Sequence, residues 1–185
     1  MRLLARMMSL GLGLSLSDKV SSLCEPSLWH IGFAVTTFWR PMTAQVSETL
    51  IYHGKKLMMF SNPLDPYLRA TGIHFVSPHT ANWRGYEGTW EIKSTEPNEG
   101  LYLVALQAHR SYEDIARLED IFPGFPDGVF AHWFSGEIRL PQGNLLKYIH
   151  GGYASTYEYD LFMEIKKGLV INKRAVHNTV DQDER

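Results

Sequence analysis

A strict alternation of apolar and polar side chains begins at Tyr86 and constrains the fold more than any other feature of the chain. The positions on one face are Tyr86, Gly88, Trp90 and Ile92. The positions on the other face are Glu87, Thr89, Glu91 and Lys93. A period of two over eight residues is typical of a strand with one buried face. We therefore expect a half-buried antiparallel strand here, anchored by its aromatic side chains.

Hairpin patterns surround this strand on both sides. Residues 49–60 contain His53-Gly54 between two β-prone runs, and Gly54 can adopt the positive φ of a tight turn. Residues 86–107 form a second hairpin, in which Leu101 to Leu106 is apolar on both faces, as in a central strand. Val129 to Leu140 is the longest strand candidate, and Pro141 to Asn144 is expected to be a turn. A last hairpin joins residues 157–166 to Leu169-Val170-Ile171 across Lys167-Gly168.

Helical signals are few. Ser111 to Asp120 has a capping-box-like start and apolar residues near helical spacing, so we expect one short helix there. Two prolines within residues 62–67 favour a loop over a helix interior. The predicted fold is therefore mainly β: an antiparallel meander of hairpins that forms a small barrel or sandwich with one short helix.

Domain organisation is expected to be simple. We predict a poorly ordered leader or over-extended start over residues 1–41, a single β-rich domain over residues 42–177, and a polar tail over residues 178–185. Patterned sequence begins only after Met42, so the interpretation we favour for residues 1–41 is an over-extended start or an unstructured extension. The alternatives are an interfacial or partner-binding arm, and an export signal over residues 1–17 with its basic start and short apolar run.

Composition excludes several classes of protein. A formal net charge of −2 gives no reason to expect nucleic acid as a partner. The apolar stretch from Leu28 to Trp39 is too short for a membrane-spanning helix, which needs roughly 20 residues. The single cysteine, Cys24, cannot form an internal disulfide, which favours a cytoplasmic protein. Export remains the alternative.

Sequence motifs for catalysis, metals and cofactors are weak or absent. The chain lacks a Gly-x-Ser-x-Gly elbow, a phosphate loop and a dinucleotide fingerprint, so no cofactor is expected. None of the eight histidines has a compact metal-binding spacing, and no metal site is predicted. The weak candidates for acid–base catalysis are His79, His132, Glu137 and Glu158. Glu137 could instead form a surface ion pair with Arg139 on the same strand face.

Aromatic residues mixed with polar ones are the most distinctive feature with a bearing on function. Such residues dominate protein interfaces and line ligand pockets. The predicted binding residues are Asn82, Trp83, Arg84, Tyr86, Trp133, Tyr153 and Tyr157. His79, Asn82 and Arg84 cluster just ahead of the Tyr86 strand, where loops commonly carry binding residues. The alternative interpretation is that the rings are core and that Arg84 stacks on Trp83.

Two stretches carry a resemblance to a known family. The runs from His79 to Ile92 and from Trp133 to Gly143, together with Gly152-Tyr153, resemble a family of small uncharacterised bacterial proteins. The resemblance spans about residues 48–176. It implies a complete, bacterial domain over that range, and it transfers no functional residue.

Three function hypotheses follow. The first is a non-enzymatic binding module that recognises a protein or a small ligand through the aromatic–polar patch. The second is a small hydrolase or isomerase that uses a His–carboxylate pair. The third is a structural subunit of an oligomer, completed by pairing of an exposed strand edge with another copy.

Overall fold

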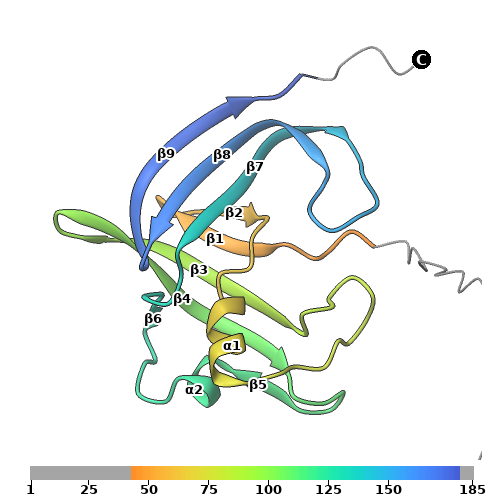
Figure 1. Cartoon of the computed structure of the whole chain (residues 1–185). Helices are drawn as coiled ribbons and strands as arrows, with labels where there is room; N and C mark the ends of the chain where they lie inside the picture. Colours follow the sequence, from red (N-terminus) through yellow and green to blue (C-terminus); the bar gives the residue numbers. More distant parts are fainter. Residues whose placement is uncertain (1–42, 180–185) are drawn as a thin grey trace, which may run out of the picture. The chain divides into compact units, whose positions relative to one another are not determined.

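Nine strands and two short helices make up the part of the chain described by the computed structural model, residues 43–179 (Figure 1). All of these residues belong to one unit. The predictions for residues 1–41 and for residues 180–185 of the tail lie outside the described residues. The elements in chain order are β1 (Glu48–Tyr52), β2 (Lys55–Met59), α1 (Asp65–Thr71), β3 (Tyr86–Thr95), β4 (Asn98–His109), β5 (Ile115–Arg117), α2 (Leu118–Ile121), β6 (Val129–Phe130), β7 (Gly136–Lys147), β8 (Thr156–Lys166) and β9 (Leu169–His177).

The strands form one sheet in the order β2-β1-β3-β4-β9-β8-β7, with β5 and β6 also paired to β4. Strands β4 and β9 share only the pair Gly100 and Leu169, so the sheet folds over at that point. Figure 1 shows β7, β8 and β9 curving over β1 to β4. At the opposite side, the Phe60 N–H donates to the Arg139 carbonyl at 2.8 Å, but no strand ladder forms between β2 and β7. The predicted mainly β fold is confirmed, as an open, sandwich-like sheet and not a closed barrel.

Apolar side chains from both halves of the fold meet in the core. Trp90 of β3 is fully buried there, with Leu50 of β1 and Leu103 of β4. Ile138 of β7 and Met163 of β8 close the core from the other half. Burial of such side chains from water is the main stabilising contribution to a fold of this kind.

The two predicted hairpins at the start of the domain are confirmed. His53 and Gly54 have φ values of 49° and 75°, as a two-residue turn with two positive φ values requires, and β1 pairs with β2 around them. Strands β3 and β4 pair along their whole length, with a bulge between Thr89 and Trp90. One pairing departs from a pure antiparallel meander, because β1 lies parallel to β3, with Leu50 beside Trp90.

The helix prediction was wrong in position. Asp65–Thr71 is helical, because Pro66 lies in the first turn, where a missing N–H breaks no helical hydrogen bond. The segment expected to be a helix, residues 111–120, is not one continuous helix, because it consists of bends, the short strand β5 and the start of α2. The Ser111 hydroxyl does accept the N–H of Asp114, at 3.0 Å, but the chain then pairs with β4 as β5, and only Leu118–Ile121 is helical.

The predicted long strand over residues 129–140 was also wrong. The chain leaves the β4 half of the sheet after β6 and joins β8 as β7, so a turn with an Ala131 carbonyl to Phe134 N–H bond separates the two strands. The predicted turn at residues 141–144 is instead an irregularity within β7, with Gly143 at φ 78°. On β8, Met163 is buried as the alternation predicts, but Tyr159, on the same predicted face, is 49% exposed.

Candidate functional site

A buried carboxyl group, that of Glu48, is the centre of the most unusual polar cluster in the described residues. Glu48 begins β1 and points inward, in phase with Leu50, and its side chain is fully buried. The indole N–H of Trp90 donates a hydrogen bond to Glu48 Oε2. Gly88 makes room for this pair, because a Cβ at position 88 would lie 2.5 Å from Glu48 Oε2. The parallel pairing of β1 with β3 therefore creates this contact.

Burial changes the ionisation of Glu48. Loss of water around the carboxyl raises its pKa to about 8, although the charge of Arg84 and the hydrogen bond from Trp90 both lower it. Desolvation is the largest of these effects, so the carboxyl is mostly protonated at neutral pH. The positive charge of Arg84 is then left without a full counter-charge from Glu48.

Arg84 lies just ahead of β3, and its side chain is only 8% exposed. Its Nη1 donates to the Tyr153 hydroxyl at 2.7 Å, and its guanidinium carbon lies 5.3 Å from the centre of the Tyr86 ring. Its Nε is 3.5 Å from Glu48 Oε1, yet this approach does not form a hydrogen bond. The buried Nε and Nη2 atoms have no hydrogen-bond partner among residues 43–179.

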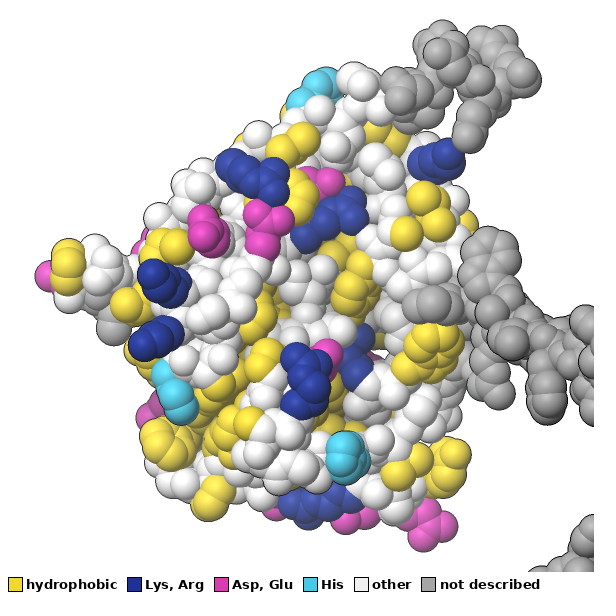
Figure 2. Space-filling view, in the orientation of Figure 1, with side chains coloured by type: hydrophobic (Ala, Val, Ile, Leu, Met, Phe, Trp, Pro, Cys, Tyr) yellow, Lys and Arg dark blue, Asp and Glu magenta, His cyan; other side chains and the backbone are white. Residues whose placement is uncertain are grey.

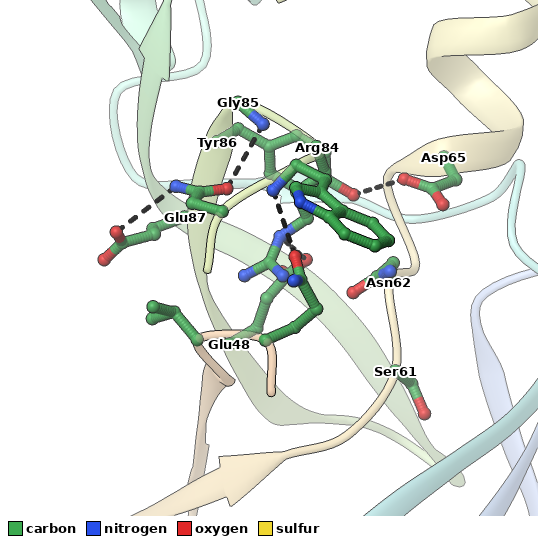
Figure 3. Close-up of polar contacts among 12 residues, drawn as sticks. Glu48, Ser61, Asn62, Asp65, Arg84, Gly85, Tyr86 and Glu87 are labelled. Atoms are coloured by element: carbon green, nitrogen blue, oxygen red, sulfur yellow. Dashed lines mark hydrogen bonds and ion pairs between the residues drawn. The ribbon is translucent and has the colours of Figure 1, made fainter. Parts of the chain in front are cut away.

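Two tyrosine hydroxyls complete the cluster. Tyr153 reaches the Asn62 side-chain oxygen at 2.9 Å, and burial raises the pKa of Tyr153 to about 12. The Tyr86 hydroxyl donates to Asp65 at 2.6 Å, and burial, with the nearby carboxyl groups, raises the pKa of Tyr86 well above its usual range. Figure 3 shows Glu48 and Arg84 approaching one another, with Asn62 and Asp65 on the chain that leads into and begins α1. Both hydroxyls thus stay protonated and can act as hydrogen-bond donors at neutral pH.

A cleft of about 290 Å³ adjoins the cluster, between α1 and the segment that precedes β3. Its lining residues are Asp65, Leu68, Arg69, Ile73, His74, Phe75, Trp83, Arg84 and Tyr86. Figure 2 shows basic side chains gathered beside apolar ones on the face that carries α1. Trp83 is 41% exposed, so it offers a ring face to a ligand. We refer to this feature as the Arg84 cleft.

The structure brings together four of the predicted binding residues. Trp83, Arg84 and Tyr86 line the Arg84 cleft, and Tyr153 bonds to Arg84 from the loop before β8. Asn82 is buried beside them but has a local role, since its side-chain oxygen accepts the Gly85 N–H at 3.2 Å.

The remaining two predicted binding residues pack elsewhere. Trp133 stacks on Phe122 and donates to the Pro63 carbonyl at 3.0 Å. Tyr157 contacts the edge of the Phe60 ring. Neither residue lines the Arg84 cleft.

The weak catalytic candidates are not brought together. His79 and His132 are exposed, and neither makes a hydrogen bond or ion pair to a carboxylate within residues 43–179. Glu137 pairs with Arg174 at 2.7 Å and not with Arg139, which instead binds the buried Asp160. Glu158 accepts two hydrogen bonds from Asn144, the main-chain one being the larger effect, and these lower its pKa.

Sequence reasoning missed Glu48, Asn62 and Asp65. A signal for Glu48 was present, because a carboxylate at the inward position of a predicted strand, in phase with Leu50 and Tyr52, calls for a buried partner. Nothing in the local sequence identifies that partner as Arg84. Asn62 and Asp65 fall in the segment that was interpreted as a loop.

Within the described part of the chain, no group of three or more His, Cys, Asp or Glu side chains gathers as metal ligands do. In the same range, no helix has the length and apolar composition of a membrane span. Searches against protein-family models, curated protein sequences and solved structures return no match. The function must therefore be judged from the geometry of the site.

Proposed function

We propose that this protein is a non-enzymatic binding module that holds a small ligand in the Arg84 cleft. The observation that carries the proposal is Arg84 itself: a guanidinium that is nearly buried, lines a concave surface and has two nitrogen atoms without a hydrogen-bond partner in residues 43–179. Buried polar groups in folded proteins are almost always hydrogen-bonded. Both atoms are buried, so a ligand in the cleft would supply the missing acceptor by displacing the side chain that covers them.

The surroundings of Arg84 support a ligand site. The Tyr153 hydroxyl and the Tyr86 ring hold the guanidinium in place, so little side-chain entropy would be lost on binding. The exposed Trp83 ring and the apolar Leu68 and Ile73 supply the apolar lining that is typical of small-molecule sites. A binding role needs no proton transfer, and Glu48, the group with the most perturbed carboxyl pKa, does not line the cleft.

A fragment screen on the full chain tests this proposal. Saturation-transfer NMR would be run with small aromatic and aliphatic acids, amides and alcohols. His74 is exposed and lines the cleft, so His74→Trp would fill the opening without disturbing the core. We expect the fragments that bind wild type to lose at least tenfold in affinity in His74→Trp.

The matched control is His132→Trp. His132 is also an exposed histidine, but it lies in the turn after β6 and does not line the cleft. Fragment binding to this variant should equal that of wild type. Fragments that bind both variants equally well, or a library that yields no binder, would contradict the proposal.

A further inference from the structure

The free donors of Arg84 have a specific geometry. Nε and Nη2 lie on the same side of a planar guanidinium and present two parallel N–H bonds, which match the two oxygens of a carboxylate. Nη1, on the other side, is already bonded to Tyr153. Glu48 Oε1 lies on this side, 3.5 Å from Nε, and it also has no hydrogen-bond partner within residues 43–179. Nε and Nη2 are buried, so a ligand carboxylate reaches them only by displacing the Glu48 carboxyl.

The charges around the cleft favour an anion. Arg69 and Arg84 are the arginines of the lining, and His74 adds a third basic group. Among the described residues of the lining, Asp65 is the only acidic one, and its carboxylate accepts a hydrogen bond from the Tyr86 hydroxyl. A ligand that carries a negative charge therefore gains from the electrostatic potential, and its apolar part can lie against Trp83.

We infer that the ligand of the Arg84 cleft carries a carboxylate group that binds the free side of Arg84, and that Glu48 competes with this group for the same guanidinium. The inference rests on the proposed function and narrows it to one class of ligand, small organic acids with an apolar body. When Glu48 is protonated, it carries no charge to hold Arg84, and a ligand carboxylate can displace it from the guanidinium. When Glu48 is ionised, its own carboxylate neutralises Arg84 and disfavours a second anion.

Glu48 is the group in this cluster whose ionisation changes near neutral pH. Its charged and titratable neighbours are Arg84 and Tyr86 on the segment at the start of β3, Asp65 on α1 and Tyr153 on the loop before β8. The pKa values of both tyrosines are raised, so neither tyrosine ionises below pH 9. Burial sets the pKa of Glu48 at about 8. The fraction of protein with Glu48 protonated therefore falls about tenfold between pH 7 and pH 9.

Phenylacetate and phenylacetamide test the first part of the inference, because they differ in charge and hardly in shape. Binding to the full chain would be followed by the indole N–H signal of Trp83 in two-dimensional NMR, assigned with Trp83→Phe. At pH 7 we expect phenylacetate to bind at least tenfold more tightly than phenylacetamide, the difference that a charge-assisted pair of hydrogen bonds provides. In Arg84→Met that preference should disappear.

The pH dependence tests the second part. The comparison is made in chains that carry His74→Gln, so that no histidine of the described lining lies beside the probe. Phenylacetate stays ionised throughout, and its affinity should fall about tenfold from pH 7 to pH 9 with Glu48 present. With Glu48→Gln it should stay constant, because an amide does not ionise.

The outcomes separate the inference from the proposed function. Equal affinity of wild type for phenylacetate and phenylacetamide would overturn the carboxylate inference. So would a screen in which every fragment that loses affinity in His74→Trp is neutral. Either result would leave the proposed binding module intact. An identical pH dependence with Glu48 and with Gln at this position would overturn the competition. Failure of every probe and fragment to reach Trp83 would overturn both. If Arg84→Met does not fold, the ratio of the affinities of wild type for the two probes still tests the carboxylate inference. The pH comparison still tests the competition by Glu48.

Discussion

Replacement of Glu48 by Gln changes one buried atom and removes one titration. The amide keeps an oxygen that can accept the Trp90 indole N–H, and it has the size of the protonated acid. Because the carboxyl is mostly protonated at neutral pH, the substitution removes little interaction with Arg84 there. Its main effect should appear in how stability depends on pH.

The direction in which stability changes with pH follows from the raised pKa of Glu48 in the folded protein. Between pH 4.5, the ordinary value for this side chain, and pH 8, the folded protein holds a proton that the unfolded chain has released. The stabilisation by protonated Glu48 is therefore complete below pH 4.5 and is lost as the pH rises to 8, by about 1.4 kcal/mol per pH unit. From pH 5 to pH 8 the free energy of unfolding of wild type should fall by about 3 to 4 kcal/mol relative to that of Glu48→Gln.

Urea unfolding followed by tryptophan fluorescence at pH 5, 6, 7 and 8 measures this difference. Other titrating groups are common to both proteins and cancel when the two free energies of unfolding are subtracted. The control is Glu164→Gln, which removes an exposed carboxylate of β8, and its curve should run parallel to that of wild type. Parallel curves for wild type and Glu48→Gln would refute the reasoning, because they would mean that Glu48 is ionised in the fold.

Two further pairs of substitutions, each a test variant with its control, examine the packing around the site and the ion pairs of the β7–β9 half. Gly88→Ala would place a methyl group against the carboxyl of Glu48, so it should cost about 1–3 kcal/mol of unfolding free energy. Gly136→Ala, whose nearest contact would be a ring edge at 3.3 Å, should change stability by less than about 1 kcal/mol. Arg139→Met would leave a buried aspartate without its two-pronged partner and should cost about 3–5 kcal/mol. The exposed ion pair of Arg174 makes Arg174→Met the control, with an expected loss within about 1 kcal/mol; equal losses for the two arginines would contradict the assignment.

Local pattern was enough to predict the hairpins. The alternation from Tyr86 to Ile92 and the turn at His53-Gly54 are encoded by neighbours in the chain, and both appear as expected. Aromatic and polar residues ahead of β3 also identified Trp83 and Arg84 as binding candidates, and both line the cleft.

The remaining features of the fold and of the site depend on pairing between strands that are distant in sequence. The pattern of a single segment does not predict such pairing. The contact of Glu48 with Trp90 and Arg84 exists because β1 lies parallel beside β3, a pairing that no local signal specifies. The apolar run over residues 129–140 is continuous in sequence, yet its two ends pair with different halves of the sheet. A proline disrupts the interior of a helix but is favourable in the first turn of one. Pro66 lies in the first turn of α1, so its effect could be predicted only if the start of the helix were known.

The most direct test of the binding site is a crystal structure of the full chain grown with phenylacetate near pH 6, where Glu48 is protonated. We predict density for the probe in the Arg84 cleft, with its carboxylate oxygens about 2.7–2.9 Å from Nε and Nη2 and its ring against Trp83. A cleft that holds only water, with Glu48 and Arg84 joined in a direct two-pronged ion pair, would contradict the account.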